Sequence, residues 1–284
     1  MGSRPNAEKH AHPSTPTYSP ELFRGTAEYY TRFRPRYPPV LLDAIGRAVG
    51  LDPAGVLLDL ACGTGEVTLA LADRVAGLWA IDQEPEMVAV ARRNALDRGI
   101  GRIHWLVGRA EDAELPEDHF GLVAVGRAFH RLNRPLIARR GLRWLRAGGY
   151  FVDLGDDSAN LFEPGEPWLA AAAEVYERRL PRAHKSRRDV TSGSVPGGPT
   201  ATSQTVLAEA GFTRITKQEF LVPQVWEIDQ FIGYLSSTSY SSRAFWGPAW
   251  ADFELDLRAT LTAFAPAGVL TETVSAYFVA GRKP

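Results

Sequence analysis

The sequence predicts an α/β protein built on a doubly wound, mostly parallel sheet. Between about residues 57 and 157, short apolar runs bounded by glycine or polar residues alternate with segments of helical periodicity. A glycine-rich turn follows the first apolar run, where such a sheet binds its ligand. The chain of 284 residues is 45% hydrophobic and 23% charged, as expected of a globular protein. Strand and helix in alternation imply right-handed crossovers.

The individual elements follow from these patterns. Buried strands are expected at 56–62, 78–82, 103–108, 122–126 and 150–155, and helices at 66–75, 85–99 and 134–148. Gly99 and Gly148 are placed to end the second and third of these helices. Beyond residue 157 we expect a helix at 168–180, a loop at 189–204, a helix at 204–212 and a strand at 213–222. An irregular, aromatic-rich stretch at 223–268 and a last strand at 271–283 complete the chain.

The domain organisation predicted from these segments is a single domain over 21–284. Residues 1–20 are rich in Pro, Ser, Thr and His and are expected to form a disordered tail. The core of the domain comprises about 40–157, 204–222 and 271–283. Mostly helical lid segments, expected to bind a substrate, are formed by 21–39, 158–203 and 223–270.

Charge and cysteine content restrict the partners. A formal net charge of −1 gives no electrostatic reason to expect nucleic acid or an anionic membrane as a partner. No apolar run approaches the roughly 18–20 residues needed to span a bilayer, and no secretory signal is recognisable. Cys62 is the only cysteine, so no disulfide can form within the chain. We therefore expect a cytoplasmic protein, and the sequence leaves its oligomeric state open.

The turn after the first strand carries the clearest ligand signal. Gly63 and Gly65 let the backbone approach a ligand at the start of a helix. A dinucleotide site would need a third glycine, where this chain has Thr68, and the carboxylate of Asp59 disfavours a pyrophosphate. Asp82 ends the next strand, at the separation expected for an acid that binds ribose hydroxyls. These residues predict a nucleoside-like, cationic ligand.

Three segments carry a family resemblance: LLDLACGTGE (57–66), AIDQEPEM (80–87) and GRAEDAELPEDHFGLVAVGRAFHRLNR (108–134). They resemble class I S-adenosylmethionine-dependent methyltransferases, and most of all the ubiquinone- and menaquinone-methyltransferase-like (type 11) group, including actinobacterial natural-product enzymes. The string EYYTRFRPRYP (28–38) is also similar to that group. The resemblance covers roughly 20–283 and implies a Rossmann-like, seven-stranded sheet whose last strand is antiparallel.

The resemblance also implies which residues bind S-adenosylmethionine; no metal is expected. The turn after the first strand would surround the methionine part and the ribose, Asp82 would bind the ribose, and other residues would meet the adenine or the methionine end. Tyr30 and Arg34 are candidates for the cofactor carboxylate. The full cofactor set is Tyr30, Arg34, Asp59, Ala61, Cys62, Gly63, Gly65, Asp82, Gln83, Met87, Ala110, Glu111, Gly126 and Arg127.

His130 is the candidate general base. It follows the fourth strand, at the rim beside the expected cofactor site, and the ordinary pKa of histidine suits proton transfer near neutral pH. A structural histidine at a strand–helix junction is the alternative. Similar enzymes often have Phe-His-Trp where this chain has Phe129, His130 and Arg131. The missing tryptophan puts one wall of the pocket, or the substrate, in question.

The acceptor is expected to be a small aromatic or apolar metabolite of secondary metabolism, methylated on carbon, oxygen or nitrogen. Residues proposed to contact it are Phe129, Trp168, Tyr234 and Tyr240, although such aromatic residues could equally form the core of the lid. The basic run at 178–188 could steer an anionic acceptor or be a solvated helix end. A cyclase that only binds the cofactor, and a non-catalytic cofactor-binding regulator, remain alternatives.

Overall fold

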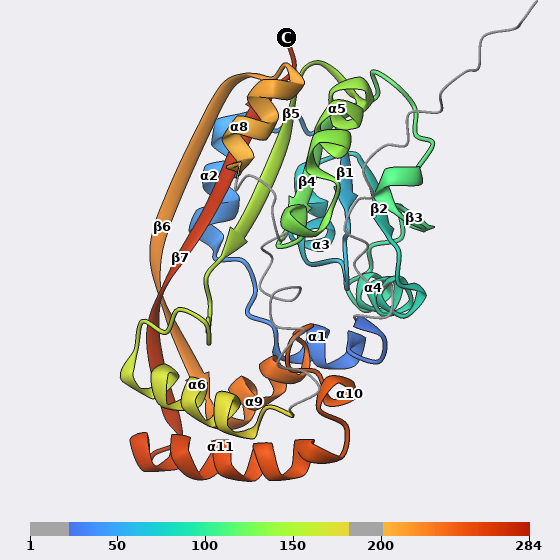
Figure 1. Cartoon of the computed structure of the whole chain (residues 1–284). Coiled ribbons are helices and arrows are strands. Elements are labelled where there is room, and N and C mark those ends of the chain that lie inside the picture. Colours follow the sequence, from blue (N-terminus) through green and yellow to red (C-terminus); the bar gives the residue numbers. More distant parts are fainter. Residues whose placement is uncertain (1–22, 182–200) are drawn as a thin grey trace, which may run out of the picture.

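A computed structural model describes residues 23–181 and 201–284 of the chain. Its centre is one seven-stranded sheet in the order β3-β2-β1-β4-β5-β7-β6 (Figure 1). The strands are β1 (Val56–Leu60), β2 (Gly77–Asp82), β3 (Ile103–Val107), β4 (Phe120–Gly126), β5 (Leu145–Asp156), β6 (Thr213–Glu227) and β7 (Val269–Arg282). The first five pair in parallel, and β7 runs antiparallel to both β5 and β6. The predicted fold class is confirmed.

Helices cover both faces of the sheet because each buries one apolar stripe against it. The first apolar cluster joins α2 (Pro39–Val49) and α3 (Glu66–Ala70) to the sheet, with Leu41, Leu57 and Phe278 fully buried. The second joins α5 (Arg134–Trp144) and α8 (Ser203–Ala210) to the opposite face, around Phe151. Short 3-10 turns complete this part: η2 (Ala72–Arg74), η3 (Ala110–Asp112) and η4 (Phe129–Arg131).

A third apolar cluster lies beyond the carboxyl ends of the core strands, where four helices pack together (Figure 1). They are α6 (Pro167–Arg179), α9 (Ile228–Ser236), α10 (Arg243–Trp246) and α11 (Trp250–Phe264), with the turn η6 (Gly247–Ala249). We call these helices the lid. The long strands β6 and β7 extend from the sheet into the lid, and Trp226 and Leu270 at their ends belong to its core.

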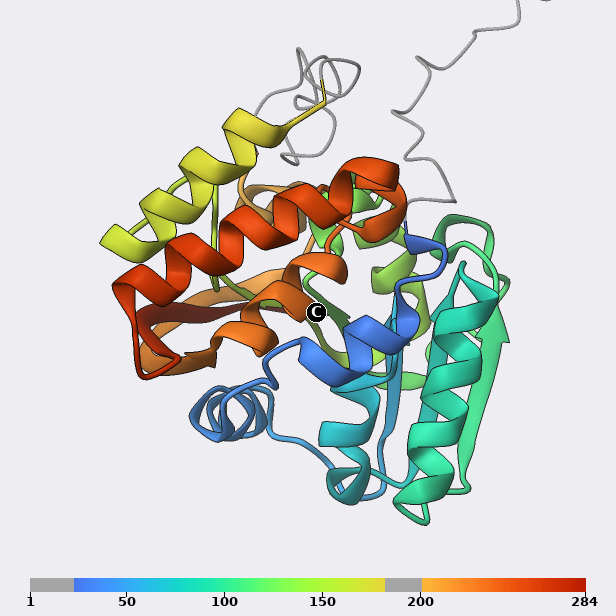
Figure 2. The ribbon, with the colours of Figure 1, turned by 90° about the horizontal axis from the view of Figure 1, so that it is seen from below.

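Helix α1 (Ala27–Phe33) lies between the lid and the sheet. It packs against α9 of the lid and against α4 (Pro85–Asp97) of the core, as the view from below shows (Figure 2). Ala27 and Tyr30 contact Met87 and Val90 of α4 in a small apolar cluster. The N-terminal segment therefore crosses the carboxyl edge of β1 and β2, which is where the sequence predicts the cofactor.

Three sequence expectations need correction. The third predicted helix does not continue to Gly148: α5 ends at Trp144, and Gly148 lies inside β5, at an irregular stretch of its pairing with β4. The stretch 223–268 is not irregular, because it completes β6 and then forms α9, α10 and α11. The strand predicted at 213–222 continues to Glu227.

Other expectations agree with the structure or concern residues that it does not describe. Gly99 directly follows the turn that ends α4 and has a φ of 69°. The predicted tail, 1–20, and most of the predicted loop at 189–204 lie outside the described residues. In the described part of the chain, no helix combines the length and the apolar character required for a membrane span.

Candidate functional site

The turn between β1 and α3 has the backbone conformation that its glycines predict. Ala61, Gly63 and Gly65 all have positive φ, of 52°, 53° and 88°. In this left-handed region a side chain costs energy, so glycine at two of the three positions relieves strain. A Cβ on Gly63 would come within 3.9 Å of the Tyr30 ring, so α1 covers this turn closely.

Asp82 joins this turn to the end of β2. Its two carboxylate oxygens accept the backbone N–H groups of Gly63 at 2.8 Å and of Glu84 at 2.9 Å. Burial raises the pKa of the Asp82 carboxyl, and these amide hydrogen bonds act against that rise. Each oxygen keeps a lone pair, so Asp82 can still accept further hydroxyl groups.

Asp59 lies beneath the turn in the interior and is 1% exposed. Its Oδ2 accepts both the hydroxyl, at 2.6 Å, and the backbone N–H, at 3.0 Å, of Thr68 in the first turn of α3. Thr68 stands where a dinucleotide-binding turn would have its third glycine. These two hydrogen bonds give Thr68 a structural role instead, because they anchor α3 to Asp59. Asp59 Oδ1 is buried and has no hydrogen-bond partner among residues 23–181 and 201–284, and burial raises the pKa of this carboxyl to about 7.

The adenine side of the predicted site is formed after β2 and β3. Gln83 is exposed at the end of β2, and Met87 is buried in α4 beneath α1. Ala110 is buried in η3, beside Glu111. Glu111 Oε1 accepts the backbone N–H of Asn133 at 3.0 Å, so this carboxylate also ties η3 to the start of α5.

The methionine side is formed where β4 ends. Arg127 has a positive φ of 53°, forms an ion pair with Asp156 at 2.5 Å, and donates to the carbonyl of Pro35 at 3.0 Å. Its guanidinium also lies over the Tyr37 ring, 4.3 Å from the centroid. Gly126 leaves room for this arrangement, since a Cβ there would lie 2.6 Å from Tyr37 Oη. Arg127 Nη1 is buried without a hydrogen-bond partner among the described residues.

Arg34 and Tyr30 connect this edge to the lid. The Arg34 guanidinium lies between two rings, 4.8 Å from the centroid of Tyr30 and 4.9 Å from that of Tyr234. Its Nε donates to Ser237 Oγ at 3.0 Å. Such stacking between aromatic faces fixes the plane of a guanidinium and leaves its edge available for hydrogen bonds.

His130 lies in η4, directly after β4, and more than a third of the residue is exposed. Desolvation lowers the pKa of its imidazole, and the positive charges of Arg131, Arg134 and Arg34 lower it further. Solvent screening limits such a shift at an exposed ring. The direction makes His130 a neutral proton acceptor at neutral pH, and a weaker base than an unperturbed histidine.

The aromatic residues predicted to contact a substrate pack mostly against other side chains of the protein. Phe129 is buried in the core and its ring lies 5.3 Å from that of Phe151. Trp168 is buried in the lid, and its Nε1 donates to the carbonyl of Thr271 at 2.8 Å. Tyr234 is also buried, and donates to the carbonyl of Ser158 at 2.9 Å. The contacts of Trp168 and Tyr234 fit the alternative that such residues form the core of the lid, whereas Phe129 belongs to the apolar cluster around Phe151.

Tyr240 is the partly buried member of the set, and its ring lies 5.0 Å from Phe162 and 6.3 Å from Tyr176. Sequence reasoning missed the residues beside it. The segment 236–242 contains five serines, which are buried between α9 and α10, and two of them bind arginines of the site. The sequence SSTSYSS (236–242) is a polar run inside the aromatic-rich stretch, and this run is the signal that could have pointed to these serines.

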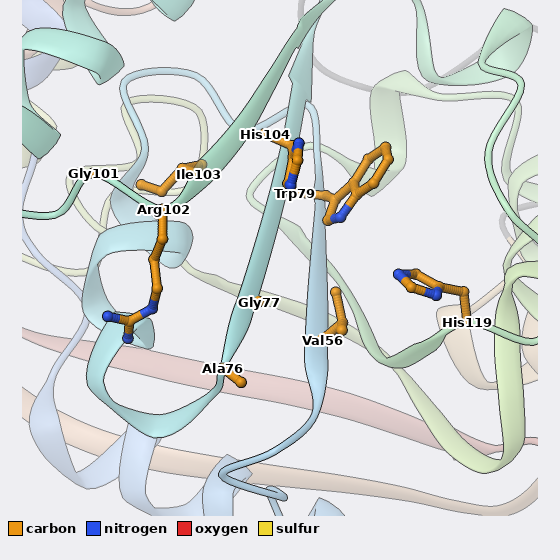
Figure 3. Close-up of a pocket in the computed structure, with 9 residues that line it drawn as sticks. All are labelled: Val56, Ala76, Gly77, Trp79, Gly101, Arg102, Ile103, His104 and His119. Atoms are coloured by element: carbon orange, nitrogen blue, oxygen red, sulfur yellow. The ribbon is translucent and has the colours of Figure 1, made fainter.

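A cavity of about 510 Å³ lies elsewhere, toward the amino ends of β1, β2 and β3 (Figure 3). Its wall includes Trp79, whose ring stacks on His104 at 4.7 Å and meets His119 edge-on at 6.2 Å. Asp82 and Gly126 are at the other ends of their strands. This cavity is therefore separate from the candidate site.

Comparison with known proteins shows that this chain is similar to methyltransferases. Residues 57–149 match the model of a methyltransferase domain. An uncharacterized methyltransferase of Mycobacterium tuberculosis is 35% identical over 120 residues, which are 42% of this chain and 46% of the relative. A ubiquinone/menaquinone biosynthesis C-methyltransferase of Hydrogenovibrio crunogenus is 30% identical over 132 residues, 45% of this chain and 50% of the relative. The matched region thus spans about half the length of these relatives.

A solved structure extends the similarity to most of the fold. The structure of a putative type II methyltransferase from Anaeromyxobacter dehalogenans has a TM-score of 0.59 and is 25% identical. It covers 88% of this chain and 98% of its own. The lid and the sheet are therefore both part of the comparison.

Proposed function

Since the chain contains a methyltransferase domain of the class I, S-adenosylmethionine-dependent type, we propose that it transfers a methyl group from S-adenosylmethionine to a small organic acceptor. One observation carries this proposal. The carboxylate of Asp82 lies at the end of β2 and accepts the backbone N–H of Gly63 in the glycine turn. This contact supports the proposal, because a carboxylate at the end of the second strand next to a glycine turn is suited to bind the ribose of a nucleoside.

The residues of this edge fit the chemistry of the cofactor. Asp82 would bind the ribose hydroxyls, and Gln83, Met87, Ala110 and Glu111 would surround the adenine. The acidic groups Asp59 and Asp82 are close to the turn, and they suit a ligand that carries a positive charge. The remaining proposed contacts of the turn are Ala61, Cys62, Gly63 and Gly65.

Two arginines are suited to the carboxylate of the cofactor. Arg34 is held between Tyr30 and Tyr234, with no carboxylate of a described residue at ion-pair distance. The buried Nη1 of Arg127 is also a donor that lacks a partner in the described part of the chain. A guanidinium and a carboxylate form strong charge-assisted hydrogen bonds, so a bound carboxylate would satisfy either group.

When bound, the cofactor supplies an electrophilic methyl group on a sulfonium. The protein's part is to align the acceptor with that methyl group, which can contribute up to roughly 7–11 kcal/mol. We propose that neutral His130 accepts a proton from an acceptor that has to lose one. Its lowered pKa makes this contribution smaller than that of a fully basic histidine, so alignment carries more of the catalysis.

We propose that the acceptor binds between η4, α1 and the lid, in part against Tyr240. An acceptor with an aromatic or apolar portion remains our proposal, and carbon is a plausible methylated atom because the Hydrogenovibrio relative is named as a C-methyltransferase. A role in secondary metabolism is likewise our proposal; the Hydrogenovibrio relative, by contrast, is named for ubiquinone and menaquinone biosynthesis. We propose further that 21–284 form one domain.

Asp82→Ala tests the cofactor site. We expect the variant to bind S-adenosylmethionine about 2–4 kcal/mol more weakly, because charge-assisted hydrogen bonds to the ribose are lost. Isothermal titration calorimetry measures this change. Asp112→Ala serves as the control, since the Asp112 side chain is 71% exposed next to the same site. Equal affinities for the wild type and Asp82→Ala would remove Asp82 from the site.

Methyl transfer itself is tested with isotopically labelled S-adenosylmethionine and candidate acceptors. A product heavier by one methyl group, together with S-adenosylhomocysteine, supports the proposed activity. Tight cofactor binding combined with rearranged but unmethylated substrate would support the cyclase instead. Binding with no chemical change in any substrate would favour a regulator.

A further inference from the structure

Asn94 of α4 bridges two segments of the cofactor edge that are distant in the sequence. Its Nδ2 donates to Thr31 Oγ1 of α1 at 2.8 Å and to the carbonyl oxygen of Thr64 at 3.1 Å. A carbonyl oxygen can only accept, so the group that faces it is the NH2 of the Asn94 amide. The two N–H groups of one amide therefore hold α1 and the glycine turn together.

The contact with Thr64 acts at the centre of the glycine turn. Thr64 lies between Gly63 and Gly65, whose φ angles are 53° and 88°. Asp82 already fixes the turn on one side by accepting the Gly63 N–H at 2.8 Å. Because the backbone of glycine is permissive, a carbonyl between two glycines needs a donor to fix its direction. Asn94 supplies that donor from outside the turn.

A second polar contact between α1 and α4 shows the contrast. Glu28 of α1 and Arg93 of α4 form an ion pair at 2.9 Å, but their side chains are 68% and 53% exposed. Water screens such a pair, so it adds little to the hold on α1. The hydrogen bond between Asn94 and Thr31 is partly buried and is stronger for being sheltered from water. We therefore expect Asn94, and not Arg93, to set how firmly α1 is held over the turn.

We infer that Asn94 is a positioning residue of the cofactor site, which holds α1 closed over the glycine turn and so slows the release of the bound cofactor. This inference rests on the proposed function, in which the turn binds S-adenosylmethionine. The ring of Tyr30, next to Thr31 in α1, would lie 3.9 Å from a Cβ on Gly63. A ligand seated on the turn is therefore covered by α1.

Asn94 acts through α1 and the turn and not by touching the cofactor. When its bond to Thr31 is lost, the groups that bind the ligand stay in place and the cover is held less firmly. The change should therefore appear in the rate of release and not in the rate of association. Since α1 leads into Arg34, which we propose for the cofactor carboxylate, the amino-acid part of the ligand should carry the effect.

The test follows the release of S-adenosylhomocysteine from the full chain by stopped-flow tryptophan fluorescence. Thr31→Val keeps the shape of the side chain, removes its hydroxyl and leaves Asn94 bonded to Thr64. Release should become about three- to tenfold faster, with association within about twofold of wild type. Asn94→Leu removes both hydrogen bonds and should speed release about tenfold or more.

A second ligand tells this role from a general loosening of the fold. 5′-Methylthioadenosine has the nucleoside and the thioether of the cofactor but no amino-acid part. Calorimetry should show that Thr31→Val binds it within about twofold of the wild-type affinity, while S-adenosylhomocysteine binds about three- to tenfold more weakly. Equal losses for the two ligands would overturn the inference.

Arg93→Gln is the matched control, because it removes the exposed ion pair to α1 from the neighbouring position of α4. Release of S-adenosylhomocysteine should stay within about twofold of wild type in this variant. An equal acceleration in Arg93→Gln, or a wild-type release rate in Thr31→Val, would overturn the inference, and Thr31→Val decides it even where Asn94→Leu fails to fold. Failure of the wild type to bind either ligand would contradict the proposed function instead.

Discussion

Asp59 illustrates how a single carboxylate can serve both the fold and the site. From the sequence, its place before the glycines indicated a cationic ligand. In the structure it holds the first turn of α3 through Thr68, and its other oxygen is buried with no hydrogen-bond partner in the part of the chain that the structure describes. The cost of this burial is visible in its pKa, which is raised from 3.8 to about 7.

This raised pKa predicts a pH dependence of stability. The folded protein binds the Asp59 proton more tightly than the unfolded chain does. The contribution of this bound proton to the free energy of unfolding is therefore complete below about pH 4 and is lost as the pH rises through about 7. Asp59→Asn keeps an acceptor for Thr68 but cannot titrate. Between about pH 5 and pH 7, the free energy of unfolding should fall more steeply in wild type, by up to roughly 1.4 kcal/mol per pH unit.

Urea denaturation of both proteins at several pH values, without cofactor, measures this difference. Other titrating groups, such as Asp153, are common to the two proteins and cancel in the comparison. Parallel stability curves would show that Asp59 is already ionised in the folded protein over this range.

His130 supports a prediction about catalysis. His130→Asn should lower turnover by about 10²-fold or less, the low end of general-base effects, because the lowered pKa weakens this base. Cofactor affinity should stay the same. Since the imidazole is already neutral at neutral pH, the pH profile of the wild-type turnover rate should show no change near pH 6.5 that could be assigned to a histidine. Steady-state kinetics across pH with a methylated acceptor measure both effects, and a wild-type rate in the variant would exclude the role of base.

At the scale of elements, α1 decides how the site is closed. Its seven residues pack on α4 and α9, and it leads into the segment that carries Arg34. The contact with α9 is close at Gly233, where a Cβ would come within 2.4 Å of the ring of Phe33. Glycine is needed here because the Phe33 ring occupies the space of a side chain.

Gly233→Ala should therefore displace α1 from α9. We expect a stability loss of about 1–3 kcal/mol from overpacking, with weaker binding of S-adenosylmethionine because Tyr30 moves off the glycine turn. Thermal unfolding and calorimetry report the two effects. Gly165→Ala is the matched control, since a Cβ there would meet nothing within 4 Å. Normal cofactor affinity in Gly233→Ala would mean that α1 is not needed to form the site.

The helices of the lid show where the sequence patterns were misleading. Residues 228–264 carry many aromatic side chains; the lid was expected to be mostly helical, but this stretch was predicted to be irregular and no helix was placed in it. They fold into α9, α10 and α11 because each helix buries its aromatic residues against the others, as with Trp246 and Phe253, stacked at 4.1 Å. Arg178 and Arg179, at the start of the basic run, pair with Asp256 of α11. The rest of that run, from residue 182, lies outside the described residues.

At the scale of the whole molecule, Trp226 joins the lid to the sheet. It is fully buried at the end of β6 and packs against Phe231 and Tyr234 of α9. Its Nε1 donates to Glu272 Oε1 of β7 at 2.7 Å. Glu272 is 8% exposed and also accepts the backbone N–H of Ala159. One hydrogen-bonded pair thus links two strands to the loop that leads into α6.

Trp226→Phe should destabilise the protein by roughly 1–3 kcal/mol, because the buried Glu272 carboxylate loses the closer of its two hydrogen-bond donors. Glu272→Gln and the double variant complete a mutant cycle by urea denaturation. A coupling energy of about 0.5–3 kcal/mol is expected for groups in direct contact. Strictly additive losses would show that the indole acts only through its packing.

By itself, the sequence determined the strand–helix alternation, the glycine turn and the two acids Asp59 and Asp82. These depend on local periodicity and on residues close together in the chain, so short-range patterns are enough to predict them. Tertiary structure alone decided which distant groups meet. It brought Tyr30 onto Gly63, Arg34 onto Ser237 and Arg131 onto Ser239, and it packed the lid aromatics on one another. Those contacts depend on how α1 and the lid fold back over the sheet, and no local sequence pattern encodes the distance between segments some 200 residues apart.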